Sequence, residues 1–195
     1  MNLRLSMASL LIRGRGQIKW LRMVDTAVTE ALVSSMKDSG SITTIISIEM
    51  PHDPRLFRSV MSQKHAHLIS ELFSQRGDAG IVQAKDELFK AGVRLGTDIR
   101  DRLRLSDEPK QLIAAARLLY RILDIDFQVD ADGKGMKVSR CSLAGYYGPF
   151  TCEVISRMDE GVVQGLNPRA NMRFKERNGS GTPICRAEIA WDEAS

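Results

Sequence analysis

Apolar residues in the first 120 positions recur mainly at intervals of three and four, which is the spacing of an amphipathic helix. One such segment runs from about Ile18 to Met36. Asp53 and Pro54 predict the start of a second helix, because aspartate is a good N-cap acceptor and proline suits the first helical turn. This second helix is expected to end near Gln75. The N-terminal part of the chain is therefore predicted to be helical.

A break in the helical pattern is predicted at residues 76–78, where Gly77 stands between two charged residues. A long amphipathic segment follows from Ile81 to Ile99, and Ser106 is expected to cap the helix after it. Residues 42–48 are rich in β-branched side chains and fit either a strand or a buried linker. Three or four core-facing helices in succession are thus expected.

The period of the pattern changes from 3.6 to 2 at Asp124. Ile125, Phe127 and Val129 alternate with polar residues, which predicts a strand with one buried face. A hairpin turn at residues 132–133 precedes a return strand that ends near Cys141. A helix over about 151–164 and two more strands, joined by a turn at 178–181, complete the pattern. Helices followed by β-β-α-β-β predict an α+β domain in which a helical layer covers a mainly antiparallel sheet.

The composition is that of a folded globular chain without a membrane-spanning segment. The chain has 195 residues, and 43 % of them are hydrophobic. Its longest apolar stretches, residues 7–12 and 42–48, fall well short of the roughly 18 residues that a membrane helix needs. The 28 basic residues exceed the 24 acidic ones, but both signs are mixed after Asp25 and no nucleic-acid-binding motif occurs. Neither a membrane nor a nucleic acid is therefore predicted as a partner.

Domain organisation and location follow from the basic residues and the cysteines. Residues 1–22 carry an uninterrupted block of basic side chains and are predicted to be a loosely attached segment. Residues 23–195 are predicted to form a single α+β domain, since their number suits one hydrophobic core. The three cysteines are odd in number and include no Cys-x-x-Cys pair, which favours a reducing cytoplasm over a disulfide framework.

Cysteine, histidine and acidic residues are the candidates for chemistry. Cys141, Cys152 and Cys185 could act as nucleophiles or could simply pack, because unpaired cysteine is among the most buried residue types. Their spacing matches no metal signature, so no metal site is predicted and no cofactor is assigned. The three histidines are expected to be structural. The acids at 124, 126 and 130 fit either a solvated strand face or ligands for a divalent cation.

Several motifs of well-known enzyme classes do not occur in the chain. The sequence contains no phosphate-binding loop, no His-Glu-x-x-His and no Gly-x-Ser-x-Gly. This argues against nucleotide hydrolysis, zinc proteolysis and the serine-hydrolase fold. Asp159, by contrast, is placed shortly before a predicted turn, where its carboxylate could face a pocket, and Arg157 could hold an anionic group there or pair on the surface.

Short motifs in the C-terminal third resemble those of a known enzyme family. They are Arg140-Cys141, Arg157-Met158-Asp159, Gly165-Leu166-Asn167-Pro168 and Gly181-Thr182-Pro183-Ile184-Cys185. In these residues and in the intervals between them, the chain resembles the L-2-amino-thiazoline-4-carboxylic acid hydrolase family. The resemblance implies hydrolysis of a carbon–nitrogen bond in a small cyclic amidine or isothiourea.

This chemistry needs a base for water, a proton donor for the departing nitrogen and a cation for the substrate carboxylate. The resemblance implies Asp159 as the base and Arg157 as the carboxylate anchor. It further implies Asn167 as a substrate contact, and Cys185 or Cys141 as a nucleophile or as part of the pocket wall.

A non-catalytic binding module is the alternative. The closing strand pair also resembles four-vinyl-reductase-type domains, which enclose small apolar or aromatic ligands and often form homodimers. The zinc site of that family would be incomplete, because Gly179 stands where a cysteine would follow Glu176. A binding role predicts an apolar pocket lined by aromatic and apolar side chains: Tyr146, Tyr147, Phe150, Met172 and Phe174. Convergence of Asp159, Arg157 and a cysteine would instead favour hydrolysis.

Overall fold

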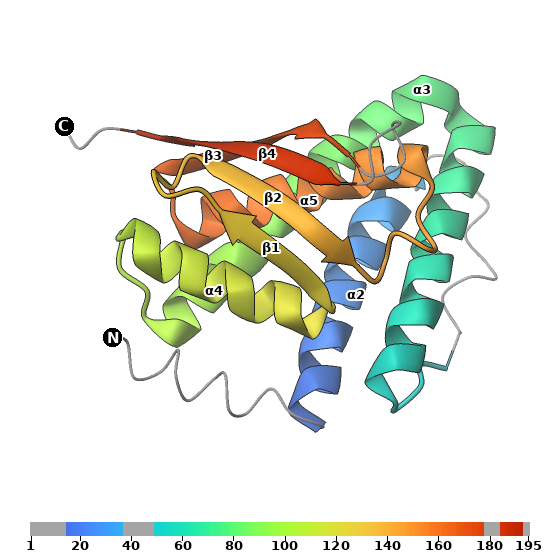
Figure 1. Ribbon diagram of the computed structural model, residues 1–195. Coiled ribbons are helices and arrows are strands. Elements are labelled where there is room, and N and C mark those ends of the chain that lie inside the picture. The colour runs from blue at the N-terminus through green and yellow to red at the C-terminus, as the bar shows by residue number, and fades with distance from the viewer. Residues whose placement is uncertain (1–14, 37–48, 178–183, 193–195) are drawn as a thin grey trace.

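The computed structural model describes residues 15–36, 49–177 and 184–192. Within these residues the chain forms helices and an antiparallel sheet, as Figure 1 shows. The elements are α2 (Arg15–Met36), α3 (Pro54–Leu103), α4 (Pro109–Ile122), β1 (Ile125–Val129), β2 (Gly135–Cys141), α5 (Pro149–Leu166), β3 (Ala170–Glu176) and β4 (Cys185–Trp191). The predicted α+β class and the order of helices followed by β-β-α-β-β are confirmed. The predictions for residues 42–48 and for the turn at 178–181 fall outside the described residues.

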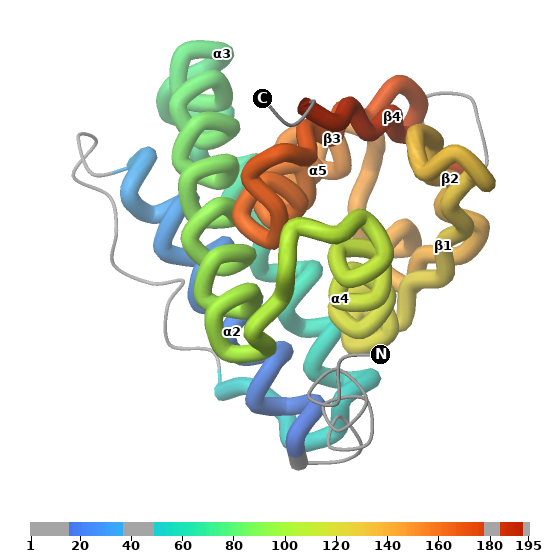
Figure 2. Tube along the Cα trace, turned by 90° about the vertical axis from the view of Figure 1, so that its left-hand side faces the viewer, coloured from blue at the N-terminus to red at the C-terminus, as the bar shows by residue number. Residues whose placement is uncertain are grey.

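The four strands form one antiparallel sheet in the order β1-β2-β4-β3. Val138 pairs with Cys185 across β2 and β4, and Met172 pairs with Ile189 across β3 and β4. Buried or half-buried residues mostly alternate with exposed ones along each strand, which gives the sheet one apolar face. Figure 2 shows this sheet on one side of the molecule, with α4 and α5 next to it and α2 and α3 beyond them. The core therefore lies between the sheet and two layers of helices.

Helix α3 confirms two predictions about the chain. Its N-cap is Asp53, whose Oδ1 accepts a hydrogen bond of 2.9 Å from the Leu56 amide, and Pro54 opens the first turn. The predicted break is present as a kink at Gly77, where φ is +56°, a conformation that glycine adopts without the steric cost of a side chain. The chain stays helical on both sides of this kink.

The expected cap at Ser106 is wrong, because helix α4 begins three residues later. Pro109 occupies the first turn and Glu108 is the N-cap residue, without a side-chain capping bond. A proline fits the first helical position best, since its missing N–H has no intrahelical partner there. The proline therefore sets the start of α4, and the Ser106 amide instead donates to Gln111 Oε1 at 2.9 Å.

Helices α3 and α5 approach each other along a seam of glycines. Gly92 and Gly96 on α3 face Gly161 and Gly165 on α5. A Cβ atom at any of these four positions would overlap backbone atoms of the other helix, such as the Val162 carbonyl oxygen opposite Gly96. The two backbones are thus in direct contact, and this seam fixes the position of α5.

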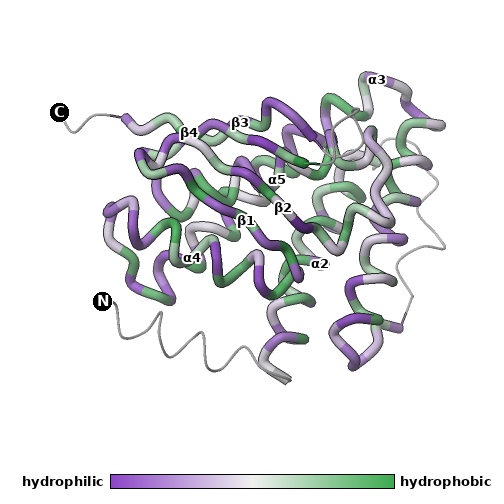
Figure 3. The backbone as a smooth tube through the Cα atoms, in the orientation of Figure 1, coloured by the Kyte–Doolittle hydropathy of each residue, from purple (hydrophilic) through white to green (hydrophobic). Residues whose placement is uncertain are grey.

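The N-terminal helix is part of the core. Helix α2 begins at Arg15, and its residue Leu21 is completely buried. It therefore includes the last residues of the segment that was expected to be loosely attached, whereas residues 1–14 lie outside the described part. Figure 3 shows hydrophobic and hydrophilic residues interspersed along each helix, as expected for elements with one buried face. None of the described helices has the length and hydrophobicity needed to span a membrane.

Candidate functional site

Two adjoining hollows lie in the core between the helices and the sheet, each with a volume of about 70 Å³. We call the first the helix hollow, because α2, α3, α4 and α5 supply most of its walls. We call the second the cysteine hollow, because Cys141, Cys152 and Cys185 all line it. Six residues border both hollows: Tyr120, Ile125, Leu143, Tyr147, Ile155 and Asp159. The surfaces of both are mainly apolar, which is typical of ligand sites in proteins.

Asp159 is the acidic residue that borders both hollows. It lies on the face of α5 that also carries Ile155 and Val162, four residues before and three after it. Burial is the main cause that raises the pKa of Asp159 from 3.8 to about 7, and the nearby charge of Glu160 adds to the rise. A carboxyl group with this pKa changes between its neutral and ionised forms near neutral pH.

Tyr120 on α4 places a hydroxyl group beside the Asp159 carboxyl. Its ring packs edge-to-face against Phe127, with the ring centroids 5.0 Å apart, which holds the tyrosine in place. The hydroxyl partly opposes the rise in the pKa of Asp159, but the geometry between the two groups is not that of a hydrogen bond. Tyr120 is only 8 % exposed, and its hydroxyl is buried without a hydrogen-bond partner among the described residues. A buried polar group without a partner is costly, so a site for a ligand atom is a physical explanation for it.

Four buried polar residues form a network that reaches the walls of the hollows through His65 and Tyr147. The Asp25 carboxylate accepts from Lys64 Nζ at 2.6 and 2.7 Å and lies 3.0 Å from His65 Nε2. His65 Nδ1 lies 3.0 Å from the Tyr147 hydroxyl. Hydrogen bonds to His65 and Lys64 lower the pKa of Asp25 despite its burial, whereas burial lowers the pKa of His65. An ionised Asp25 therefore accepts a hydrogen bond from the Nε2–H group of a neutral His65. His65 Nδ1 in turn accepts a hydrogen bond from the Tyr147 hydroxyl.

Sequence reasoning did not identify this network, because it treated the histidines only as structural residues. His65 borders the helix hollow and Tyr147 borders both hollows. A signal was available, since His65 lies four residues after Met61 and three before Leu68, on the buried stripe of α3. A histidine on an apolar stripe needs a polar partner from another element, and Asp25 on α2 supplies it.

The three cysteines are thiols that meet at the cysteine hollow from β2, α5 and β4. Burial raises the pKa of Cys141 and raises that of Cys152 to about 12. Because the thiolate is the nucleophilic form, these two sulfurs are weak nucleophiles near neutral pH. No group of cysteine, histidine and acidic side chains in the described residues has the arrangement of a metal site.

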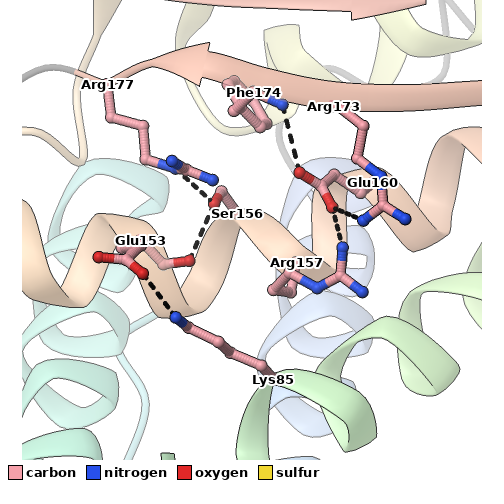
Figure 4. Close-up of polar contacts among 8 residues, drawn as sticks. All are labelled: Lys85, Glu153, Ser156, Arg157, Glu160, Arg173, Phe174 and Arg177. Atoms are coloured by element: carbon pink, nitrogen blue, oxygen red, sulfur yellow. Dashed lines mark hydrogen bonds and ion pairs between the residues drawn. The ribbon is translucent and has the colours of Figure 1, made fainter. Parts of the chain in front are cut away.

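Arg157 lies outside both hollows, in contrast to Asp159, Cys141 and Cys185. Figure 4 shows that it and Arg173 both contact the buried Glu160 carboxylate. The Arg157 guanidinium also lies 4.8 Å from the centre of the Phe89 ring. The physical reason is helix geometry. Residues two apart on a helix point in nearly opposite directions, so Arg157 and Asp159 cannot face the same space.

Asn167 also lies away from the hollows and supports the turn after α5. Its Nδ2 donates to the Asp107 carbonyl at 2.9 Å, and its Oδ1 accepts from the Arg169 amide at 3.0 Å. Of the aromatic and apolar residues expected in a pocket, Tyr147 and Phe174 line a hollow, whereas Met172 is buried elsewhere and Tyr146 and Phe150 are exposed. Arg177 borders the cysteine hollow, and its Nε donates to Ser156 Oγ at 2.9 Å, as Figure 4 shows.

Acidic residues near β1 form ion pairs. Asp124 and Asp126 both pair with Arg140, at 3.0 and 2.8 Å, on an exposed surface. This arrangement agrees with the expectation of a solvated strand face.

Comparison with known proteins identifies a similar fold. No protein-family model matches the chain, and neither does any curated protein. The resemblance to the thiazoline-carboxylate hydrolases therefore receives no support. A solved structure with a similar fold is that of a trafficking protein particle complex subunit 3 from Naegleria fowleri, covalently bound to palmitic acid. The TM-score is 0.52 and the identity is 14 %, over 70 % of this chain and 95 % of the other.

Proposed function

We propose that this chain is a ligand-binding domain that encloses a small, mainly apolar molecule in the helix hollow and the cysteine hollow. The observation that carries the proposal is the buried hydroxyl of Tyr120, which lies without a partner at the border of two apolar hollows. Packed cores contain few voids, and their polar groups are almost always paired. A void and an unpaired polar group occur together at this site. They are best explained by a ligand that has an apolar body and a polar group.

The structural neighbour supports this proposal at the level of the fold. It carries a covalently bound palmitic acid, whose hydrocarbon chain is an apolar ligand. The hollows of this chain are smaller than such a ligand requires, because 70 Å³ corresponds to room for about five water molecules. We therefore propose a ligand of a few carbon atoms, or a hollow that widens when a longer ligand enters.

Hydrolysis of a carbon–nitrogen bond in a small cyclic amidine or isothiourea is the second candidate. The observation in its favour is that Asp159 shares the cysteine hollow with Cys141 and Cys185. Against it, the hollow lacks Arg157, so the proposed carboxylate anchor is missing, although Arg177 borders the same space. Turnover of 2-amino-thiazoline-4-carboxylate that is lost in both Asp159→Asn and Cys185→Ser would favour hydrolysis over binding alone.

The binding proposal is tested by filling the hollows. Ile155 borders both hollows, so Ile155→Phe is expected to block them, whereas Val82→Phe introduces the same phenylalanine side chain on the exposed side of α3. A series of short alkanols and alkylbenzenes is screened by thermal unfolding. Each protein is compared with its own ligand-free state, because a ligand that binds the folded form alone raises the unfolding temperature.

The wild type and Val82→Phe are expected to be stabilised by the same members of the series, and Ile155→Phe by none of them. Isothermal titration of the best member provides the affinity directly. Equal stabilisation of Ile155→Phe, or no stabilisation of the wild type by any member, would contradict the proposal.

A further inference from the structure

We infer that the ligand of the helix hollow is a small apolar primary amine, bound as its ammonium ion by the Asp159 carboxylate. This inference rests on the proposed ligand-binding function and names the chemical class of the ligand. It follows from the hydrogen-bonding groups that the hollow presents and from the charges around it.

The polar groups at the hollow are mainly acceptors of hydrogen bonds. An ionised Asp159 has only acceptor oxygens, and the Tyr120 hydroxyl can accept as well as donate. The Tyr147 hydroxyl already donates its hydrogen bond to His65 Nδ1, and the N–H at His65 Nε2 donates to the Asp25 carboxylate. Tyr147 therefore has only acceptor capacity left for a ligand. A primary ammonium group carries three donors and no acceptor, which complements this set.

The charges around the hollow have the sign that an ammonium group requires. The described residues that line the helix hollow include Asp159 but no lysine or arginine. A ligand carboxylate would face Asp159 there without a cation to balance either charge, which is strongly unfavourable in apolar surroundings. An ammonium group would instead form a charge-assisted hydrogen bond with the carboxylate, and such bonds are roughly twice as strong as neutral ones.

The cysteine hollow gives the ligand a direction. Arg177 borders that hollow but not the helix hollow. Its positive charge disfavours a second cation beside it, so the ammonium group belongs at Asp159, on the border of the two hollows. The hydrocarbon part then extends among the apolar side chains of the helix hollow, such as Val28, Leu119 and Val162.

Binding of the ammonium ion requires an ionised Asp159 and therefore depends on pH. The titratable and charged groups that face or adjoin this carboxyl come from several parts of the fold. They are Tyr120 on α4, Cys141 on β2, Cys185 on β4, Tyr147 after β2, Arg177 after β3, His65 on α3, and Cys152 and Glu160 on α5. Burial raises the pKa of Tyr120, Tyr147, Cys141 and Cys152, so these groups stay neutral between about pH 6 and pH 8. Burial also lowers the pKa of His65 from its usual value of 6.5, which favours the neutral form of its ring. Asp159, with a pKa of about 7, is the group that is expected to set the pH dependence.

The test compares three ligands with the same six-carbon chain: hexylamine, 1-hexanol and hexanoate. Isothermal titration is performed on the wild type at about pH 6 and about pH 8, and on the variants Asp159→Asn and Asp124→Asn at about pH 8. Asp124 is a matched control, because it is a half-buried acid that forms ion pairs with arginine and lines neither hollow. Binding of 1-hexanol to Asp159→Asn shows that this variant is folded and that its hollow is open.

Hexylamine is expected to bind the wild type at least about ten-fold more tightly than 1-hexanol at about pH 8. This advantage is expected to fall by about ten-fold at about pH 6, where only about a tenth of Asp159 is ionised. Asp159→Asn should lose the preference for the amine and keep 1-hexanol, and Asp124→Asn should behave as the wild type.

Other outcomes separate the two proposals. If 1-hexanol or hexanoate binds the wild type most tightly, or if the preference for hexylamine survives in Asp159→Asn or is unchanged by pH, the amine inference is overturned while the ligand-binding function stands. If none of the three ligands, nor any member of the alkanol and alkylbenzene series, binds the wild type, both proposals fail.

Discussion

The glycine seam between α3 and α5 predicts that a single methyl group at Gly96 destabilises the fold. A Cβ atom there would overlap the Val162 carbonyl oxygen and would lie 2.9 Å from both the Gly165 Cα and the Leu166 amide nitrogen. These neighbours are backbone atoms, which cannot rotate away as a side chain does, so the two helices must move apart. The glycine is thus a requirement of the packing, although alanine is the better helix former.

The size of the effect follows from two opposing contributions. Inserting a methyl group into a packed interior costs about 1–3 kcal/mol, and contacts with backbone place Gly96→Ala at the upper end. The higher helix propensity of alanine returns about 1 kcal/mol. The net loss in the free energy of unfolding is therefore about 2 kcal/mol, which corresponds to a fall of roughly 4–8 °C in the unfolding temperature for a chain of this length.

The assay is urea unfolding followed by circular dichroism, with Gly145→Ala as the control. Gly145 has no heavy atom within 4 Å of an added Cβ, so its replacement is expected to change the free energy of unfolding by no more than about 0.5 kcal/mol. A Gly96→Ala protein as stable as the wild type would refute the argument. Helix propensity would then exceed the packing cost, and the seam would be looser than described.

Two further predictions concern buried charges. Asp25→Asn removes the charged partner of the buried Lys64 ammonium and is expected to lower the free energy of unfolding in urea by about 3–5 kcal/mol. A decrease of less than about 1 kcal/mol would show that water solvates Lys64 instead. Asp159 keeps its proton in the folded state up to about pH 7 but loses it near pH 3.8 when unfolded, so its contribution to stability falls as the pH rises between these values. The free energy of unfolding of Asp159→Asn, measured relative to that of the wild type, should therefore increase between about pH 4 and about pH 8 by an amount on the order of 2–4 kcal/mol. A difference between the two proteins that stays constant with pH would contradict this.

The secondary structure was largely predictable from the sequence, because local patterns determine it. The alternation of Ile125, Phe127 and Val129 marks β1, and Asp53 with Pro54 marks the start of α3. The N-cap of α4 was misplaced to Ser106 because a favourable residue type was given more weight than Pro109, whose position fixes the first turn.

The candidate site was predicted only in part, because it depends on contacts between distant elements. The sequence pointed to Asp159, Cys141 and Cys185, and all three line the cysteine hollow. The prediction that Arg157 and Asp159 share one site ignored the rotation of about 100° per residue along a helix. This rotation places residues two apart on different faces, and it could have been applied from the sequence alone. The contact between Asp25 and His65, by contrast, joins residues 40 apart and could not be derived from local spacing.

The glycine seam also determines which walls of the hollows can yield. Backbone in contact with backbone has little freedom to separate or compress, so the side formed by α3 and α5 is stiff. The opposite side consists of α4 and the connection between β2 and α5, where side chains such as Leu143 and Tyr147 provide the lining. If the hollows expand to admit a larger ligand, the movement is therefore expected in α4 and in the connection between β2 and α5. Substitutions that enlarge the hollows without destabilising the fold should be sought in the same two segments.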